Sequence, residues 1–265
     1  AEAIVQTASV SKEPVGKAQS ETIARFAEGS PPALASVLAS EPLPDVLELS
    51  RLPRASERLE FALGRHDLTG QVANGDLVWS NFLVAGAPRS GRSMALSVCA
   101  HGLQPNHELW AVGQAASMFD RSLAHHVAFG RADVIGELLE QLADQATSGS
   151  GDTPVLFIDD VDTLEDPSLN MVWDKLSKLD DLRIVASLET RSIVGYSSNP
   201  LLGTLKRARR MLVLQPDDAA EVHQATGVKP PIRPGQPMVA GRGVLVVDRA
   251  PTIVQVAMRS APSVV

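Results

Sequence analysis

The stretch from Gly86 to Ser93 has the glycine spacing of a phosphate-binding loop. It reads Gly-Ala-Pro-Arg-Ser-Gly-Arg-Ser, so Arg92 stands where this motif calls for lysine. The two glycines let the backbone turn tightly, and successive N–H groups can then point at phosphate oxygens in front of a helix N-terminus. Ser93 offers a hydroxyl to a magnesium ion that bridges the outer phosphates. The stretch predicts binding of ATP with Mg²⁺ at Gly86, Ala87, Pro88, Arg89, Ser90, Gly91, Arg92, Ser93 and Met94.

The arginine at position 92 has different consequences for nucleotide binding and for nucleotide hydrolysis. Arginine is permanently charged and can bond phosphate as a fork, but its planar head does not occupy the compact position of an ammonium group. A misplacement of about 1 Å at a reacting centre can cost on the order of a hundredfold in rate. The substitution therefore predicts binding with low or absent hydrolysis.

The second motif is acidic. It consists of Asp159 and Asp160, directly after an apolar run at residues 155–158. Asp159 fits an acid at the end of a central strand that holds magnesium through water. Asp160 stands where a hydrolytic motor has a glutamate that orients the attacking water, and it is shorter by about 1.5 Å. A structural reading of Asp160 and Asp162 is an acidic cluster at a helix N-terminus, capped by Asp162 or Thr163. Both readings stay open for Asp160, and the structural one is favoured for Asp162.

From residue 81 onward the pattern alternates between strands and helices, which predicts an α/β fold with a mostly parallel sheet covered on both faces. A β-hairpin of residues 243–247 and 252–256 ends the pattern. The predicted strands are residues 82–85, 109–112, 126–129, 155–160, 183–186 and 211–214, and the predicted helices are residues 93–101, 131–147, 169–179 and 201–209.

The first eighty residues are interrupted by prolines and predict a connector and a strap over the core. Residues 1–11 align without gaps to residues 250–260, which has two explanations: the chain opens on the last strand of a preceding copy, or short strands resemble one another by chance. The first explanation divides the chain into a preceding strand (1–10), a linker (11–49) and one ATPase-like domain (50–265).

Composition narrows the classes of partner and compartment. The formal net charge is −7 and the pI is near 5.4, which does not favour DNA as a partner but leaves a local basic patch open. The single cysteine, Cys99, lies in an apolar run and reads as a small core residue in a reducing compartment. No apolar stretch is long enough to span a bilayer, so a cytosolic chain is predicted, with membrane anchoring left to a longer parent protein.

Taken together, these motifs resemble the FtsK/SpoIIIE branch of the RecA-like motor ATPases. Residues 61–67 look like the lead-in strand of that family, and residues 81–93 are similar to its phosphate loop. Residues 156–162 are closer to the Asp-Asp-x-Asp version of the EccC/EssC ATPases of type VII secretion than to the Asp-Glu-Phe version of DNA translocases. The tail, from residue 233 through 241–244 to 254–257, looks like the ending of the same secretion ATPases.

The resemblance implies a RecA-like P-loop NTPase fold and a degenerate later ATPase domain of a membrane-anchored, hexamer-forming actinobacterial motor. Neighbouring ATPase domains of the same chain and a secreted protein substrate are the implied partners. A further departure weakens catalysis: the family's DNA pumps have a sensor glutamine after the strand at 184–186, where this chain reads Ser187 to Arg191, and Arg191 is only a displaced candidate.

Arg207, in a basic cluster with Lys206, Arg209 and Arg210, is a candidate arginine finger for a neighbour's nucleotide. Cations that complement a helix C-terminus are the favoured alternative, with a typical contribution of about 0.3–1 kcal/mol. Three functions remain: a working secretion ATPase domain, a nucleotide-dependent binding or regulatory module, and a double-stranded DNA translocase domain. The preferred prediction is a nucleotide-binding domain of a type VII-like secretion ATPase, with hydrolysis weak or absent.

Overall fold

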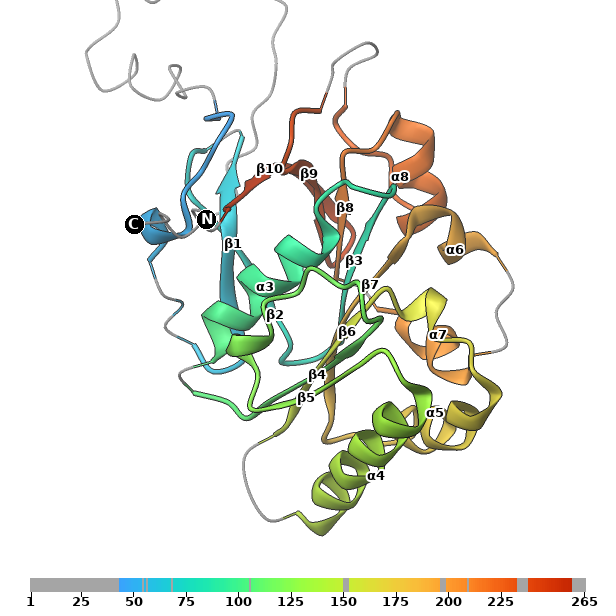
Figure 1. The fold of residues 1–265 in the computed structure, drawn as a ribbon. Coiled ribbons are helices and arrows are strands. Elements are labelled where there is room, and N and C mark those ends of the chain that lie inside the picture. Colours follow the sequence, from blue (N-terminus) through green and yellow to red (C-terminus); the bar gives the residue numbers. More distant parts are fainter. Residues whose placement is uncertain are drawn as a thin grey trace, which may run out of the picture. The chain divides into compact units, whose positions relative to one another are not determined.

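The computed structural model describes residues 43–258, apart from 54, 56, 68, 105, 150–152, 196–198, 209 and 233–237. Its strands form one sheet in the order β2-β1-β10-β9-β8-β3-β7-β6-β4-β5 (Figure 1). Their bounds are β1 Glu60–His66, β2 Val72–Asp76, β3 Phe82–Gly86, β4 Leu109–Gly113, β5 His126–Phe129, β6 Val155–Asp159, β7 Arg183–Glu189, β8 Arg210–Leu214, β9 Arg242–Val247 and β10 Ala250–Val256.

The helices of the described residues connect and cover these strands. The α-helices are α3 Arg92–Leu103, α4 Ala132–Ser148, α5 Asn170–Leu176, α6 Thr190–Val194, α7 Pro200–Leu205 and α8 Ala219–Thr226. The short 3-10 helices are η1 Leu49–Arg51, η2 Arg121–Leu123, η3 Val161–Thr163 and η4 Pro167–Leu169. Among these helices none is both long and apolar enough to cross a membrane.

The sheet has a parallel half and an antiparallel half. Strands β3, β7, β6, β4 and β5 pair only in parallel, and β9, β10, β1 and β2 pair only antiparallel. Strand β8 joins the two halves, since it is parallel to β3 and antiparallel to β9. Every residue of β3, β4, β6 and β8 is buried. Parallel strands covered on both faces read as continuous apolar runs. The apolar runs of the sequence are therefore the central strands.

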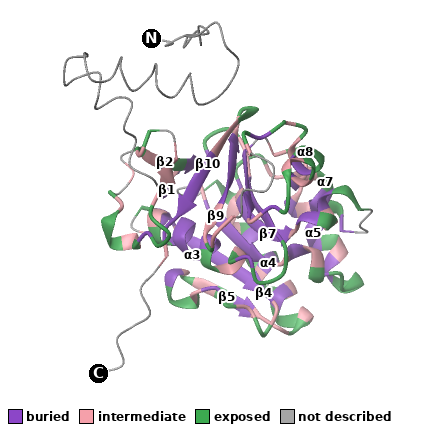
Figure 2. Cartoon of the chain, turned by 90° about the horizontal axis from the view of Figure 1, so that it is seen from above, coloured by how far each residue is buried: buried purple, intermediate pink, exposed green. Residues whose placement is uncertain are grey.

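Helices cover both faces of this sheet and enclose two apolar cores (Figure 1). On one face, Leu83 and Ala85 of β3 join a core with α4, α5, α7 and α8. On the other face, Phe82 and Val84 join a core with α3, β1 and β2, in which Cys99 is fully buried. Figure 2 shows the buried residues concentrated in the strands, with exposed residues on the outer helices and loops.

The sequence predicts the α/β class and the central elements correctly. The expected strands from residue 82 onward and the C-terminal hairpin are all present, and α3 and α4 match their predicted ranges within two residues. Two helices are shorter than predicted, since α5 ends at Leu176 and α7 ends at Leu205. The hairpin lies between β8 and β1, so it does not end the sheet.

The prediction of a connector and strap over the first eighty residues is wrong for residues 60–76. These residues form β1 and β2, which extend the sheet beyond the hairpin. Phe61 and Leu63 are completely buried and pack in the core with α3. The family resemblance of residues 61–67 indicated this strand, whereas proline content alone did not.

Residues 43–51 run beside the C-terminal segment. Glu48 forms a bridge with Met258, and Leu47 is buried. The predictions of a preceding strand at 1–10 and of a linker as far as residue 42 lie outside the described residues, as do the tail motif at 233–237 and Arg209.

Candidate nucleotide-binding site

The phosphate loop connects the buried end of β3 to the start of α3. Two of its residues have left-handed backbone conformations, with φ of 68° at Arg89 and 96° at Gly91. Glycine tolerates this conformation best, and open space surrounds the position of a Cβ at Gly91. A Cβ at Gly86 would instead overlap the Ser90 side chain. The two glycines therefore serve different needs: close packing at Gly86 and an open turn at Gly91.

The start of α3 leaves hydrogen-bond donors unpaired. A helix leaves its first N–H groups without an intrahelical acceptor, and the Gly91 cap supplies no side-chain acceptor. The hydroxyl of Ser90 is also buried and has no partner. Donors at a helix N-terminus attract anions because of the partial positive charge there. This loop thus has the unsatisfied groups that a bound phosphate would satisfy.

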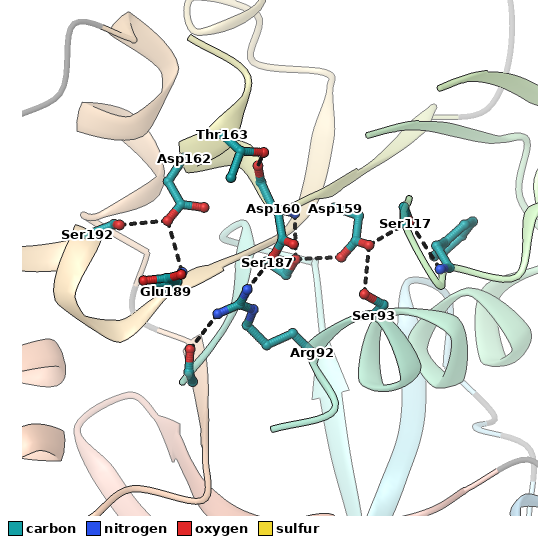
Figure 3. Close-up of polar contacts among 12 residues, drawn as sticks. Arg92, Ser93, Ser117, Asp159, Asp160, Asp162, Thr163, Ser187, Glu189 and Ser192 are labelled. Atoms are coloured by element: carbon teal, nitrogen blue, oxygen red, sulfur yellow. Dashed lines mark hydrogen bonds and ion pairs between the residues drawn. The ribbon is translucent and has the colours of Figure 1, made fainter. Parts of the chain in front are cut away.

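Asp159 lies at the end of β6, where three serine hydroxyls hold its carboxylate (Figure 3). Ser93 and Ser117 donate to Oδ2 over 2.7 and 2.6 Å, and Ser187 donates to Oδ1 over 2.7 Å. The three serines come from α3, from the loop after β4 and from β7. The contact between Ser93 and Asp159 places the two predicted magnesium residues together.

Two partners hold the Arg92 side chain in place. Its Nη1 donates to the carbonyl of Gly86 over 2.6 Å, and its Nη2 lies 2.7 Å from Oδ1 of Asp160. The Arg92 side chain is only 10% exposed, compared with 32% for Asp160. Asp160 has φ of 53° and accepts this contact from the turn that follows β6. The two residues that depart from the motor pattern therefore form an ion pair with each other.

The surroundings of Asp160 oppose its ionisation on balance. Burial raises the pKa of Asp160 above its ordinary value, the Arg92 guanidinium acts in the opposite direction, and the neighbouring Asp159 raises it again. Burial disfavours the charged carboxylate because it removes water from the group. The Arg92 guanidinium thus offsets part of the free-energy cost of ionising Asp160 beside Asp159.

Asp162 stabilises a different element from the one the sequence indicates. Its Oδ2 accepts hydrogen bonds from the N–H of Glu189 and the hydroxyl of Ser192, at the start of α6. It does not cap η3, in whose first turn it lies. The prediction that Asp162 caps the helix after β6 is therefore wrong: Asp162 has a structural role, but at α6, which follows β7. Arg191, the displaced sensor candidate, is exposed and pairs with Glu189.

A cavity of about 350 Å³ opens beside the loop. Its lining combines loop residues, the two acids and the segment after β4, with Met118 81% exposed at the rim. The lining residues are Arg89, Gly91, Arg92, Ser93, Met94, Gln114, Ala116, Ser117, Met118, Asp159 and Asp160. Gly86, Ala87, Pro88 and Ser90 belong to the same loop but not to this lining.

Arg207 lies at the other edge of the sheet. Strands β3 and β8 are parallel, with Phe82 opposite Arg210 and Gly86 opposite Leu214. Arg207 precedes β8, whereas the phosphate loop follows β3, so the two positions are separated by the length of the strands. Arg207 therefore takes no part in the cavity beside the phosphate loop of its own chain.

Ser117 and Ser187 are the site residues that sequence reasoning missed as such. Ser187 follows the predicted strand at 183–186, in the stretch where the sensor glutamine of the family's DNA pumps is absent. Because parallel strands end at the same sheet edge, its position beside Asp159 could have indicated the contact. Ser117 offered no signal, since it lies in an irregular segment whose path depends on the tertiary fold.

The donor set fits a nucleotide with magnesium better than a metal ion alone. Within the described residues no group of three or more histidine, cysteine, aspartate or glutamate side chains could hold a metal. Magnesium in such sites uses few protein ligands and completes its shell with phosphate and water oxygens. The adjacent hydroxyl of Ser93 and carboxylate of Asp159, beside unpaired loop donors, meet that requirement.

Comparisons with known proteins agree with this geometry at the level of the fold. No family model matches the chain, and no curated protein matches its sequence. The cytoplasmic domain of the type VII secretion ATPase EccC from Thermomonospora curvata has a TM-score of 0.63 and 18% identity, over 83% of this chain and 28% of that chain. The EssC structure of ATPases 2 and 3 from Geobacillus thermodenitrificans has a TM-score of 0.63 and 14% identity, over 92% and 50%.

The conjugation coupling protein TcpA of pCW3, solved as a monomer form with ATPγS, has a TM-score of 0.60 and 14% identity, over 82% of this chain and 70% of that chain. These similarities confirm the predicted RecA-like P-loop NTPase fold. This chain spans no more than half the length of the EccC and EssC chains just described.

Proposed function

We propose that this chain is a nucleotide-binding domain of an FtsK/SpoIIIE-type motor, within a type VII-like secretion ATPase, and that it hydrolyses ATP weakly or not at all. The observation that carries this proposal is the ion pair between Arg92 and Asp160. It joins the two positions at which a hydrolytic motor has lysine and glutamate, and it leaves the loop donors and the Ser93–Asp159 contact in place.

Binding would depend on the loop and on the end of β6. The first N–H groups of α3 and the Ser90 hydroxyl would hold phosphate oxygens, and Ser93 with Asp159 would hold the magnesium ion. When bound, Mg²⁺ neutralises charge on the outer phosphates. Ser117 and Ser187 keep the Asp159 carboxylate oriented toward Ser93, because each donates a hydrogen bond to it.

Hydrolysis would suffer because the Arg92 and Asp160 charges are engaged with each other. A general base must reach the proton that it removes, and its carboxylate must be available to water. The Asp160 carboxylate accepts from Arg92, and the Arg92 guanidinium is also fixed to the Gly86 carbonyl. Moving either group toward a phosphate or a water would break a part-buried ion pair.

The wider assembly belongs to this proposal as well. The similar structures include an EccC chain with ATPases 2 and 3 in complex with a signal sequence peptide. By analogy, we propose neighbouring ATPase domains, a hexameric full protein with a membrane-anchored parent and a cytoplasmic location for this domain, and a secreted protein as substrate. Arg207 stays a candidate finger toward a neighbouring copy, since it is exposed and has no carboxylate partner among the described residues.

Binding and turnover on the purified chain test the proposal directly. Mg·ATP is expected to raise the melting temperature without phosphate release above buffer, and Ser93→Ala should remove most of the Mg²⁺-dependent part of the shift. Ser177→Ala is the matched control, because its hydroxyl donates to a backbone carbonyl at an exposed position. Absence of any shift would contradict nucleotide binding, and strongly salt-dependent binding to duplex DNA would favour the translocase alternative.

The double variant Arg92→Lys with Asp160→Glu tests the cause of weak hydrolysis. It is expected to release phosphate faster than the unaltered chain, because it restores the compact ammonium and the longer carboxylate. The same exchange at the exposed pair, Arg131→Lys with Asp133→Glu, is the control and should change nothing. Rapid turnover by the unaltered chain, lost in Ser93→Ala, would refute weak hydrolysis while leaving nucleotide binding intact.

A further inference from the structure

A second cavity, of about 430 Å³, lies at the edge of the sheet opposite the phosphate loop. It is enclosed by the ends of α7 and α8, the start of β8 and the turn between β9 and β10; both helices lie on the same face of the sheet (Figure 1). The lining residues are Lys206, Arg207, Ala208, Met211, Ala225, Thr226, Gly227, Val228, Val246 and Arg249. Nothing in the proposed nucleotide site uses these residues, apart from the candidate finger Arg207.

The cavity carries three cations and no acid in its lining. Within the described part of the chain, Lys206, Arg207 and Arg249 form no ion pair with a carboxylate. Lys206 donates from Nζ to the carbonyl of Gly195 over 2.6 Å, and Arg207 makes one long contact of 3.4 Å to the Thr204 hydroxyl. The next arginine along the chain differs, because Arg210 lies 2.9 Å from Asp76. The absence of a counter-charge is thus a feature of the cavity.

Helix ends neutralise only part of this charge. Both α7 and α8 end at the cavity, and each C-terminus carries a partial charge of roughly −0.5 at most. Three cations against two helix ends leave about two positive charges. A phosphate monoester carries about −1.5 to −2 at neutral pH. The residual charge of the cavity therefore matches a single phosphate group.

The turn that carries Arg249 has an unusual backbone for an arginine. Asp248 and Arg249 have φ of 47° and 70° in the two-residue turn between β9 and β10. Such turns favour asparagine or glycine, because a left-handed conformation strains other side chains. An arginine thus occupies a position where glycine would be less strained, and this arginine lines the cavity.

The floor of the cavity is apolar. Met211 and Val246 are 3% and 4% exposed, and Ala225 is 9% exposed. Partial burial lowers the pKa of Lys206, and no acid in the cavity lining acts in the opposite direction. The Lys206 ammonium has three donors and gives one to Gly195, so two remain for a ligand.

We propose that this cavity binds a phosphate monoester with an apolar body, held by Lys206, Arg207 and Arg249 around its phosphate group. The apolar floor would receive the body of the ligand, and the cations would meet its oxygens. Because Lys206 also holds Gly195, which follows α6, the bound ligand would lie beside the helix that Asp162 supports from the nucleotide side.

In the test, phenyl phosphate is titrated into the full chain in Mg²⁺-free buffer. The chemical shifts of backbone amides are recorded by NMR at each step. The amide of Gly227 reports this cavity, and the amide of Gly91 reports the phosphate loop. Phenyl phosphate is expected to shift the Gly227 signal saturably, and inorganic phosphate should do so more weakly because it lacks the apolar body. Phenol, the neutral relative, should leave the signal in place.

Variants separate a built site from diffuse charge. Arg249→Gln and Lys206→Met should each weaken the phenyl phosphate affinity at Gly227 about tenfold or more, because each removes a charge-assisted hydrogen bond. Lys229→Gln removes the same charge just outside the lining and should leave the affinity unchanged. A Gly227 signal that does not move, that moves equally with phenol, or that responds to Lys229→Gln as strongly as to Arg249→Gln would overturn the proposal.

Folding of the variants is checked separately. Arg249→Gly relieves the left-handed strain, so it is expected to be at least as stable as the unaltered chain and still to lose phenyl phosphate binding. Retention of full affinity in a folded Arg249→Gly variant would also overturn the proposal.

Discussion

The two cavities lie at opposite ends of the strands of one mixed sheet, and their cations differ in whether they are paired with an acid. At the carboxyl edge, Arg92 is part-buried, bonded to the Gly86 carbonyl and paired with Asp160. At the amino edge, Lys206, Arg207 and Arg249 line a larger cavity with no acid in its lining. A paired cation contributes to the structure of its site, whereas unpaired cations are available to an incoming anion. A positive charge alone therefore does not identify an anion-binding residue. Whether the cation is already paired with an acid determines whether it is available to a ligand.

The largest expected effect concerns protection of Cys99 by nucleotide. Cys99 is fully buried in α3, directly behind the phosphate loop, and burial raises the pKa of its thiol. Alkylation then requires unfolding, so Mg·ATP at about 100 times its dissociation constant should slow the reaction roughly a hundredfold. Mass spectrometry of iodoacetamide-treated protein measures this rate. Equal alkylation rates with and without Mg·ATP would show that the cavity beside the phosphate loop does not bind the nucleotide, and the contrast between the two cavities would fail.

Removal of the paired cation should destabilise the fold. Arg92→Met leaves Asp160 part-buried without its partner, at an expected cost of about 1–3 kcal/mol in the free energy of unfolding. Urea denaturation measures the loss. Arg131→Met is the control, since its pair with Asp133 is exposed and its removal should have much less effect. Similar losses in the two variants would show that burial of the Arg92 pair does not matter.

Replacement of a cation that has no acidic partner should change the free energy of unfolding in the opposite direction. Arg249→Gly removes a side chain from a left-handed turn position, and a gain of about 1 kcal/mol in the free energy of unfolding is expected. Thermal denaturation at matched salt measures the gain. A loss as large as that of Arg92→Met would mean that Arg249 has a structural partner, and the contrast between the two edges would fail.

The smallest effect is a pH dependence at Asp160. Its pKa is raised in the folded state above the ordinary 3.8, so the folded state binds more protons than the unfolded state between the two values. The stability of the unaltered chain relative to Asp160→Asn should therefore fall as the pH rises through that window and then stay level. Urea titrations at several pH values measure the difference.

Asp166→Asn supplies the control with the opposite sign. Hydrogen bonds from Ser168 lower the pKa of Asp166, so its contribution is lost as the pH falls. The same slope for both variants would contradict the environment assigned to Asp160.

Local signals predicted much of the molecule. The run at residues 155–158 and the loop at Gly86 to Ser93 predicted β6, the end of β3 and the start of α3 correctly, because each depends on burial or spacing within a few residues. Strands β1 and β2 were missed from composition, since Val72–Asp76 has only alternating burial and gains its order from pairing with β1. The short helices α6 and α8 were missed because five and eight residues carry little periodicity.

The sequence by itself determined the phosphate loop, the acidic strand end and the α/β alternation, because glycine spacing and apolar runs act locally. It also identified Arg92 and Asp160 as separate departures from a motor pattern. Only the tertiary structure decided that these two residues face each other, that Ser117 and Ser187 hold Asp159, and that Arg207 lies at the opposite edge of the sheet. Those relations join residues far apart in the chain, and they follow from strand order and from loop paths that no short stretch encodes.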